Sequence, residues 1–224
     1  MIEVLNSFNC TTNTFFVAID IMDTYLQKSS KIFSTKDIHL IGVTSMLLAS
    51  KMEEIIPFKI STVVEKMTHG KMQSKEIANC ENDILTTLNF KLLEQPSLFI
   101  FIEFLLVKLG FHDHPLVDDI NKIITYISKM LMHDYSLVSK YPLKYLATSC
   151  IYICLKIIEQ VKRDLKTKIY VEKLKMMLKL DDEIFYASSE NLLALAKGFE
   201  KSFPYAKNLI KFDSFSLDKD KKLY

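Results

Sequence analysis

The segment 38–55, IHLIGVTSMLLASKMEEI, constrains the fold of this chain more than any other, because it predicts a helix that is apolar on nearly every side. Between His39 and Ser50 it contains no Asp, Glu, Lys or Arg, and a helix without a polar face belongs in the centre of a packed core. The apolar run is too short to cross a membrane, which takes roughly 20 consecutive apolar residues. We therefore expect a central helix on which the others pack, and we call it the hub helix.

The carboxyl end of the hub helix is charged. Lys51 follows the apolar run, Glu53 and Glu54 come next, and Pro57 ends the helix. Lysine is almost never buried without a partner, so Lys51 is expected where the core meets the surface. The simplest interpretation is an amine that reaches water and complements the negative end of the helix dipole. Neighbouring helical residues point about 100° apart, which favours two solvated glutamates over a catalytic pair.

The composition predicts an all-α protein. Of the 224 residues, 49% are hydrophobic and 25% charged, a balance typical of a folded chain. Glycine occurs four times and proline five, and alternating β-branched runs are missing. Apolar periodicity, capping residues, Gly and Pro predict helices over 1–8, about 15–26, 38–55, 60–67, 75–88, 96–109, 115–133, 143–159, 170–178 and 182–199. A docked and then frayed tail is expected over 204–224, with Phe212 and Phe215 as its apolar residues.

The chain resembles itself at an offset of 105 residues. The hub residues Gly42, Ser45, Ala49, Lys51 and Glu54 then fall on Ala147, Cys150, Cys154, Lys156 and Glu159. The preceding helix repeats at the same offset, since Ile19, Met22, Tyr25 and Leu26 fall on Ile124, Ile127, Met130 and Leu131. Two matches in order predict two copies of one five-helix unit, joined near residues 91–95.

Catalytic and metal-binding patterns are weak. Cys150 and Cys154 share a helix face but lie among apolar residues, which favours a core position. The run 112–114, His-Asp-His, lies between Gly110 and Pro115 and is more simply a loop than a metal site. No Gly-rich phosphate loop occurs. We expect no enzyme activity, no cofactor and no metal.

The cysteines and the amino-terminal sequence indicate where the protein works. The four cysteines have no disulfide-framework spacing, so they are expected to be reduced. No secretory signal opens the chain. Both features point to the cytosol or the nucleus.

The net charge of +2 gives no strong field for nucleic acid. Arg163 is the only arginine in the sequence, whereas proteins that read base edges usually use several. A basic cluster could contact phosphates, although acidic neighbours favour a solvated helix and loop surface. Its members are Lys162, Arg163, Lys166, Lys168, Lys173 and Lys175.

Two stretches resemble the cyclin family. LIGVTSMLLASKMEEIIP, with ENDILTTLNFKL and QPS downstream, resembles the centre of the first cyclin box. MLMHDYSLVSKYPLKYLATSCIYICLK resembles the second box of mitotic A/B-type cyclins, most like the B type through Asp134, Tyr135, Val138 and Pro142. The resemblance implies two tandem five-helix cyclin-box repeats: an N-terminal box over 1–92 with its first helix truncated, a C-terminal box over 96–203, and a tail over 204–224.

The resemblance also implies a function. Cyclins bind and activate a cyclin-dependent protein kinase as a heterodimer, in nucleus and cytoplasm, with no catalysis of their own. Lys51 matches the lysine that donates to kinase backbone carbonyls, and Glu81 matches the glutamate that accepts from kinase amides. The positions of an apolar pocket for a kinase helix match Leu48, Met52, Leu85, Phe90 and Leu92. For Met52, Leu85 and Phe90, ordinary core packing remains the alternative.

Two other functions stay open, and one family feature is missing. A tandem cyclin-fold transcription factor, similar to general initiation factors that bind DNA and polymerase, should show a stronger basic surface. An enzyme should show a deep polar pocket with perturbed titratable groups. The family's substrate-docking patch, of the type Met-Arg-x-x-Leu with a Trp, has no match in this chain, which contains no Trp.

Overall fold

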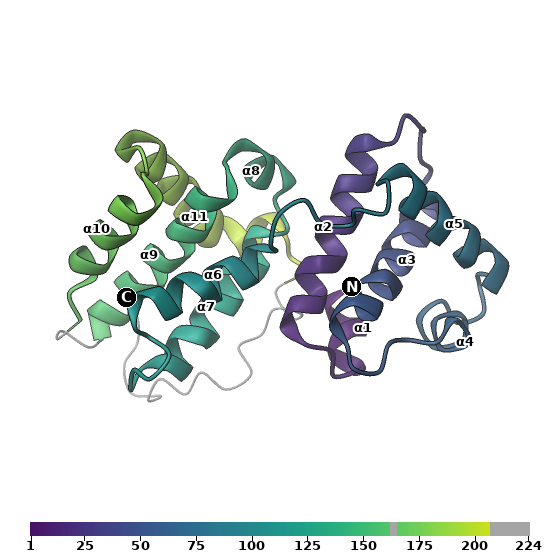
Figure 1. Ribbon diagram of the computed structural model, residues 1–224, viewed down its shortest axis with the longest axis horizontal. Helices are drawn as coiled ribbons and strands as arrows, with labels where there is room; N and C mark the ends of the chain where they lie inside the picture. The colour runs from purple at the N-terminus through teal and green to yellow at the C-terminus, as the bar shows by residue number, and fades with distance from the viewer. Residues whose placement is uncertain (162–164, 207–224) are drawn as a thin grey trace. The chain divides into compact units, whose positions relative to one another are not determined.

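The computed structural model describes residues 1–161 and 165–206, and all regular structure in these ranges is helical, as the sequence predicts (Figure 1). The chain divides into two compact units, Met1–Ile100 and Phe101–Tyr224. The helices are α1 (Ile2–Ser7), α2 (Thr12–Lys28), α3 (Thr35–Glu53), α4 (Ile60–Thr62), the π-helix η1 (Val63–Met67), α5 (Ser74–Thr87), α6 (Leu98–Leu109), α7 (Val117–Leu131), α8 (Tyr135–Lys140), α9 (Leu143–Val161), α10 (Thr167–Leu178) and α11 (Asp182–Ser202). The expected tail contacts of Phe212 and Phe215 lie outside the described residues.

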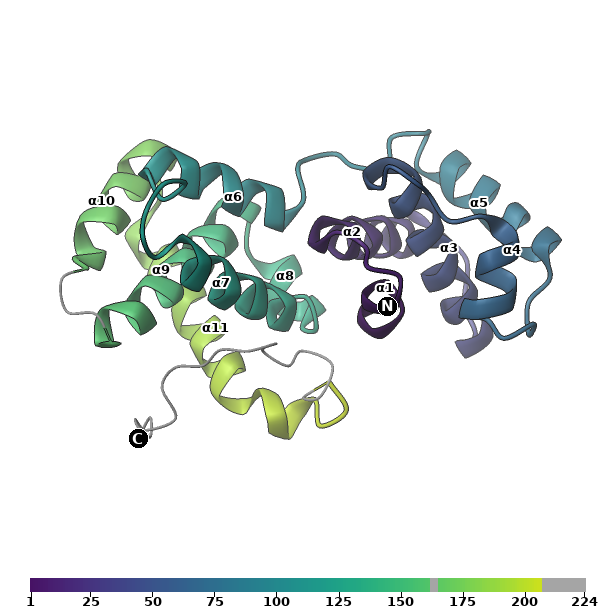
Figure 2. The same ribbon diagram turned by 90° about the horizontal axis from the view of Figure 1, so that it is seen from below.

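The hub helix α3 is the centre of the first unit. Its residues from Ile41 to Ser50 are all buried, and α3 lies between α2 and α5 (Figures 1 and 2). A capping box starts it, since Asp37 N donates to Ser34 Oγ at 3.3 Å and Ser34 N donates to Asp37 Oδ2 at 2.9 Å. A Cβ on Gly42 would lie 3.3 Å from Met1 Cε, so the small side of α3 allows α1 to approach.

The short helix expected over 60–67 is confirmed, as one turn of α4 followed by the π-helix η1. The helix expected from residue 75 begins one residue earlier, at Ser74, because Gln73 is its N-cap and Glu76 Oε2 accepts the amide of Gln73 at 2.7 Å, which completes a capping box. Gly70 takes a left-handed conformation, with φ +72°, in the connection between η1 and α5.

In the second unit, α9 is the buried helix and packs against α7, α10 and α11. Cys150 and Cys154 are 0% exposed, as the core interpretation predicts. The sequence interpretation missed α8, a short helix whose N-cap Asp134 accepts the amide of Leu137 at 3.1 Å. The helices expected to begin at Pro96 and Pro115 begin at Leu98 and Val117, because each proline lies just before its helix and not in its first turn.

The offset of 105 residues relates paired helices in the two units. Added to the bounds of α2, it gives 117–133, against Val117–Leu131 for α7. Added to the bounds of α3, it gives 140–158, against Leu143–Val161 for α9. Each unit therefore contains a buried apolar helix and an earlier helix that packs on it, α2 on α3 and α7 on α9, although α8 lies between the second pair in sequence.

Within the described ranges, no helix combines the length and the apolar character needed to cross a lipid bilayer.

Candidate functional site

Lys51 and Glu81 meet where α3 ends beside α5. Lys51 Nζ lies 2.5 Å from Glu81 Oε1, and the two side chains are 42% and 15% exposed. Thirty residues separate them in sequence, so the fold brings together the two charged residues that the resemblance singled out. The amine is therefore paired, and with a 42% exposed side chain in the last turn of α3 it also reaches water, as the simpler interpretation predicts.

The apolar residues of the predicted site differ in exposure. Met52 is 45% and Phe90 70% exposed, while Leu85 and Leu92 are half-buried. Leu48 is only 3% exposed and faces the core. Met52 and Phe90 thus offer apolar surface near the ends of α3 and α5, whereas Leu48 is a buried residue of the core.

The end of α5 holds Phe90 in an unusual backbone conformation. Asn89 and Phe90 both have positive φ, at 51° and 58°. The amide of Asn89 donates to Thr86 O at 3.1 Å and that of Phe90 donates to Leu85 O at 2.7 Å. This is the Schellman pattern of helix termination, with Asn in the position that glycine usually takes. The motif fixes the backbone of Phe90 beside that of Leu85, so one helix-terminating motif positions two residues of the predicted site.

Two exposed isoleucines follow the end of α3 and are absent from the predicted kinase-binding set. Ile55 is 100% and Ile56 84% exposed, directly after α3. Adjacent large apolar side chains in full contact with water are a typical sign of an interaction surface. The signal was present in the sequence, because both residues follow the charged end of the hub helix and precede Pro57.

Glu53 and Glu54 are neither a catalytic pair nor solvated side chains. Glu53 Oε2 accepts from Asn13 Nδ2 at 2.7 Å. Glu54 Oε1 accepts from the backbone N of Thr11 at 2.8 Å and from Thr14 Oγ1. Both carboxylates therefore bind the first turn of α2, and the expectation of solvated glutamates is wrong.

In the second unit, the lysine equivalent to Lys51 is Lys156, and its ion pair differs from that of Lys51. Lys156 Nζ pairs with Glu159 Oε2 of the same helix at 2.8 Å. Glu159 Oε1 also accepts the amide of Thr167 at 3.1 Å, at the start of α10. The Lys51 equivalent thus makes its ion pair within α9 and not with a second helix.

The basic cluster of the second unit is partly structural. Lys173 Nζ donates to Lys108 O at 3.0 Å. Lys175 is 8% exposed, and its amine lies 2.8 Å from Asp182 Oδ1 and 4.9 Å from the ring centroid of Tyr186. The hydrogen bond to Asp182 raises the pKa of Lys175. The predicted solvated surface is therefore wrong for Lys175, and Lys162 and Arg163 lie outside the described residues.

The described residues offer no group of three His, Cys, Asp or Glu side chains that could hold a metal ion. His112 Nε2 lies 2.7 Å from Asp113 Oδ2 in a loop. Burial raises the pKa of Cys150 to about 12 and raises that of Cys154 further. Neutral, buried thiols are inert.

The first unit matches a known domain. Residues 1–93 match the sequence model of the family described as "Cyclin, N-terminal domain". This range contains every residue of the predicted site, including the Lys51–Glu81 pair.

Curated relatives and a solved structure extend the similarity to the second unit. The chain is 24% identical over 163 residues to Cyclin-A1-1 of Arabidopsis thaliana, covering 73% of this chain and 34% of that protein. It is 32% identical over 162 residues to G2/mitotic-specific cyclin-B1 of Caenorhabditis elegans, covering 70% of this chain and 44% of the relative. The matches thus span less than half of the length of these relatives. The fold is that of a viral cyclin from herpesvirus saimiri, with a TM-score of 0.68 at 18% identity over 87% of this chain and 81% of the other.

Proposed function

We propose that the chain is a cyclin of the mitotic type, most like the B type, which binds a cyclin-dependent protein kinase and activates it without catalysing a reaction itself. The observation that carries the proposal is the Lys51–Glu81 ion pair at 2.5 Å, within the range that matches the cyclin N-terminal domain. Such a protein acts where its kinase acts, and we propose the nucleus and the cytoplasm.

The chemistry of the pair suits the backbone of a partner. An ammonium group has three donors, and Glu81 takes one of those of Lys51, which leaves two for partner carbonyl oxygens. A carboxylate accepts at both oxygens, so Glu81 can accept from partner amides while it holds Lys51. Main-chain groups of this kind are unpaired at the ends of a helix. Met52, Ile55, Ile56 and Phe90 supply exposed apolar surface for the side chains of such a helix.

Activation by such a protein is a population shift. A protein kinase needs the helix of its small lobe turned inward, so that its glutamate pairs with the lysine on the nucleotide phosphates. A partner that binds only the inward form raises the population of that form in proportion to its differential affinity. The Lys51–Glu81 pair and the exposed apolar residues beside it bind the active form of the kinase and contribute no catalytic group.

Co-purification with a cyclin-dependent kinase, followed by a histone phosphorylation assay, tests the proposal. The wild-type chain should retain the kinase and switch it on, and Lys51→Ala and Glu81→Ala should lose both properties. Lys156→Ala is the matched control, because its lysine occupies the equivalent position of α9 and pairs within its own helix. Equal retention by all three variants contradicts the proposed interface.

A tandem cyclin-fold transcription factor is the alternative, and the contacts of the basic cluster weigh against it. Lys173 and Lys175 are engaged with main-chain and acidic groups of their own unit. Phosphate binding depends steeply on salt, so a salt-sensitive gel shift with promoter DNA would favour the alternative.

A further inference from the structure

A buried amide, that of Asn13, joins three helix ends in the first unit. The residue lies in the first turn of α2 and is 8% exposed. Asn13 Nδ2 donates to Glu53 Oε2 at 2.7 Å, at the carboxyl end of α3. Ser97 Oγ donates to Asn13 Oδ1 at 2.5 Å, just before α6. An amide suits this position because it supplies a donor for the carboxylate and an acceptor for the hydroxyl.

Ser97 fixes the residue at which α6 begins. It is 2% exposed, and its Oγ accepts the amide of Ile100 at 3.3 Å, which is the bond of an N-cap. One turn after Asn13, the ring of Phe16 stacks on that of Phe99, with centroids 5.4 Å apart and an interplanar angle of 10°. The first turn of α2 therefore holds the first turn of α6 by a polar and an apolar contact. All of these residues belong to the first unit.

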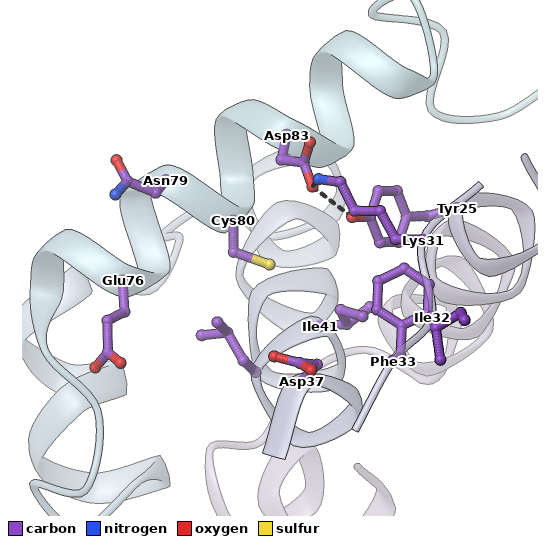
Figure 3. A pocket seen from close by; sticks show the side chains of 11 residues that line it. Tyr25, Lys31, Ile32, Phe33, Asp37, Ile41, Glu76, Asn79, Cys80 and Asp83 are labelled. Carbon is purple, nitrogen blue, oxygen red and sulfur yellow. Dashed lines mark hydrogen bonds and ion pairs between the residues drawn. The ribbon is translucent and has the colours of Figure 1, made fainter. Parts of the chain in front are cut away.

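The other end of α2 is bonded to the helix that carries Glu81. Tyr25 Oη, near the end of α2, donates to Asp83 Oδ2 at 2.5 Å, and Lys31 Nζ donates to the same oxygen at 2.6 Å. Figure 3 shows both side chains pointing toward Asp83 of α5. At its two ends α2 thus bonds to α5 and α3, the helices that supply Glu81 and Lys51 to the predicted kinase-binding site.

We propose that Asn13 is a positioning residue of the kinase-binding site, an inference that rests on the proposed function. Glu53 lies two residues after Lys51 in the last turn of α3. Its bond to Asn13 holds the turn that presents the amine, at a position set by Ser97 and the start of α6. Asn13 and Ser97 are buried, so they affect a partner only through the residues that they hold.

Reversal of the hydrogen bond between residues 13 and 53 tests the role of Asn13. Asn13→Asp places a carboxylate beside Glu53, and two carboxylates have no donor to share. In the double variant Asn13→Asp/Glu53→Gln an amide again donates to a carboxylate, and the net charge equals that of the wild type. Affinity is measured by calorimetric titration with the cyclin-dependent kinase that co-purifies with the wild-type chain. It should fall about tenfold in the single variant, within the usual range for coupled sites, and return to near wild type in the double variant.

Ser97→Ala tests the link to α6, because a side chain that is 2% exposed cannot contact the kinase itself. It should weaken kinase binding about fivefold. Ser149→Ala is the matched control, since Ser149 is 0% exposed and its Oγ lies 2.6 Å from Ser188 Oγ in the second unit. Both substitutions remove a hydroxyl from a buried hydrogen bond and should lower stability in urea. Ser149→Ala should leave the affinity of the folded chain unchanged.

Two results overturn the positioning role of Asn13 alone. One is a double variant that binds the kinase as weakly as Asn13→Asp. The other is a loss of affinity in Ser97→Ala no larger than that in Ser149→Ala, which is the result expected if the bonds of Asn13 serve only the stability of the fold. A wild-type chain that does not bind the kinase overturns the proposed function as well.

Discussion

Glu54 caps a helix to which it does not belong, because its Oε1 accepts the backbone N–H of Thr11 at 2.8 Å. Thr11 is the N-cap of α2, and its own side chain caps no backbone group. A carboxylate at this position also complements the positive end of the helix dipole. The carboxyl end of α3 thereby fixes the amino end of α2, next to the Lys51–Glu81 pair.

Glu54→Ala should lower the free energy of unfolding by about 1–3 kcal/mol, the range for loss of hydrogen bonds to a charged group. Urea denaturation measures the loss. Glu65→Ala, at an exposed position of η1, is the control and should stay within about 0.5 kcal/mol of wild type. A loss no larger than that of the control would show that α2 does not depend on Glu54.

Removing either partner of the Lys51–Glu81 pair should affect binding much more than stability. The pair is partly exposed, so each alanine variant should lose less than about 1 kcal/mol of unfolding free energy. The free energy of kinase binding by each variant should become less favourable by about 2–5 kcal/mol, as when one side of a buried hydrogen-bonded charge pair is removed. Calorimetric titration of the two single variants and the double variant gives the coupling. Additive losses would mean that the two residues contact the partner independently.

Asn89 should control the position of Phe90. With φ at 51°, Asn89 occupies a conformation that costs a β-branched residue more than 1 kcal/mol and costs glycine nothing. Asn89→Gly should keep or raise stability, and Asn89→Val should lower it by about 1–2 kcal/mol and weaken kinase binding. Thermal unfolding and affinity, measured on both variants, check this. Unchanged binding in a folded Asn89→Val protein would separate Phe90 from the interface.

Asp20 should make the protein more stable in mild acid. Burial, and then repulsion from Asp23, raises the pKa of Asp20 to about 7, and burial raises that of Asp23 to about 6. The folded chain holds these protons more tightly than the unfolded chain, whose aspartates titrate near 3.9. Their contribution to stability is therefore complete below about pH 4 and is lost as the pH rises through about 7.

Asp20→Asn should accordingly raise the free energy of unfolding at pH 7.5 by about 1–3 kcal/mol, with little effect at pH 4. Denaturation at the two pH values measures the difference. Glu190→Gln, at an exposed position of α11, should show no such dependence. A gain of equal size at both pH values would attribute the effect to packing and not to ionisation.

The sequence predicted the helices well where burial decides them. The apolar run of α3 admits only a central position, and ten consecutive residues from Ile41 to Ser50 are buried. It failed where short-range polar contacts decide. α8 is six residues long, too short for apolar periodicity, and it begins because Asp134 caps it. The first residue of α5 depends on which of two adjacent polar side chains, Gln73 or Ser74, makes the capping bond.

The candidate site could be predicted only in part. Helical spacing places Glu81 and Leu85 on one face, and resemblance added Lys51, but nothing local predicts that α3 and α5 bring the charges to 2.5 Å. Glu53 and Glu54 contact residues 40 and 43 positions earlier in the chain, and such contacts leave no periodic signal. The burial of Lys175 leaves no periodic signal either, because its partner Asp182 lies on another helix.

The ion pair of Lys156 with Glu159 of its own helix has a consequence for the number of kinase molecules that one chain is expected to bind. Glu159 pairs with this lysine along its own helix, so at the position equivalent to Lys51 the described part of the second unit has no ion pair to a second helix. Under the proposed function, the described residues therefore supply the Lys51–Glu81 arrangement once, which predicts that one molecule binds one kinase.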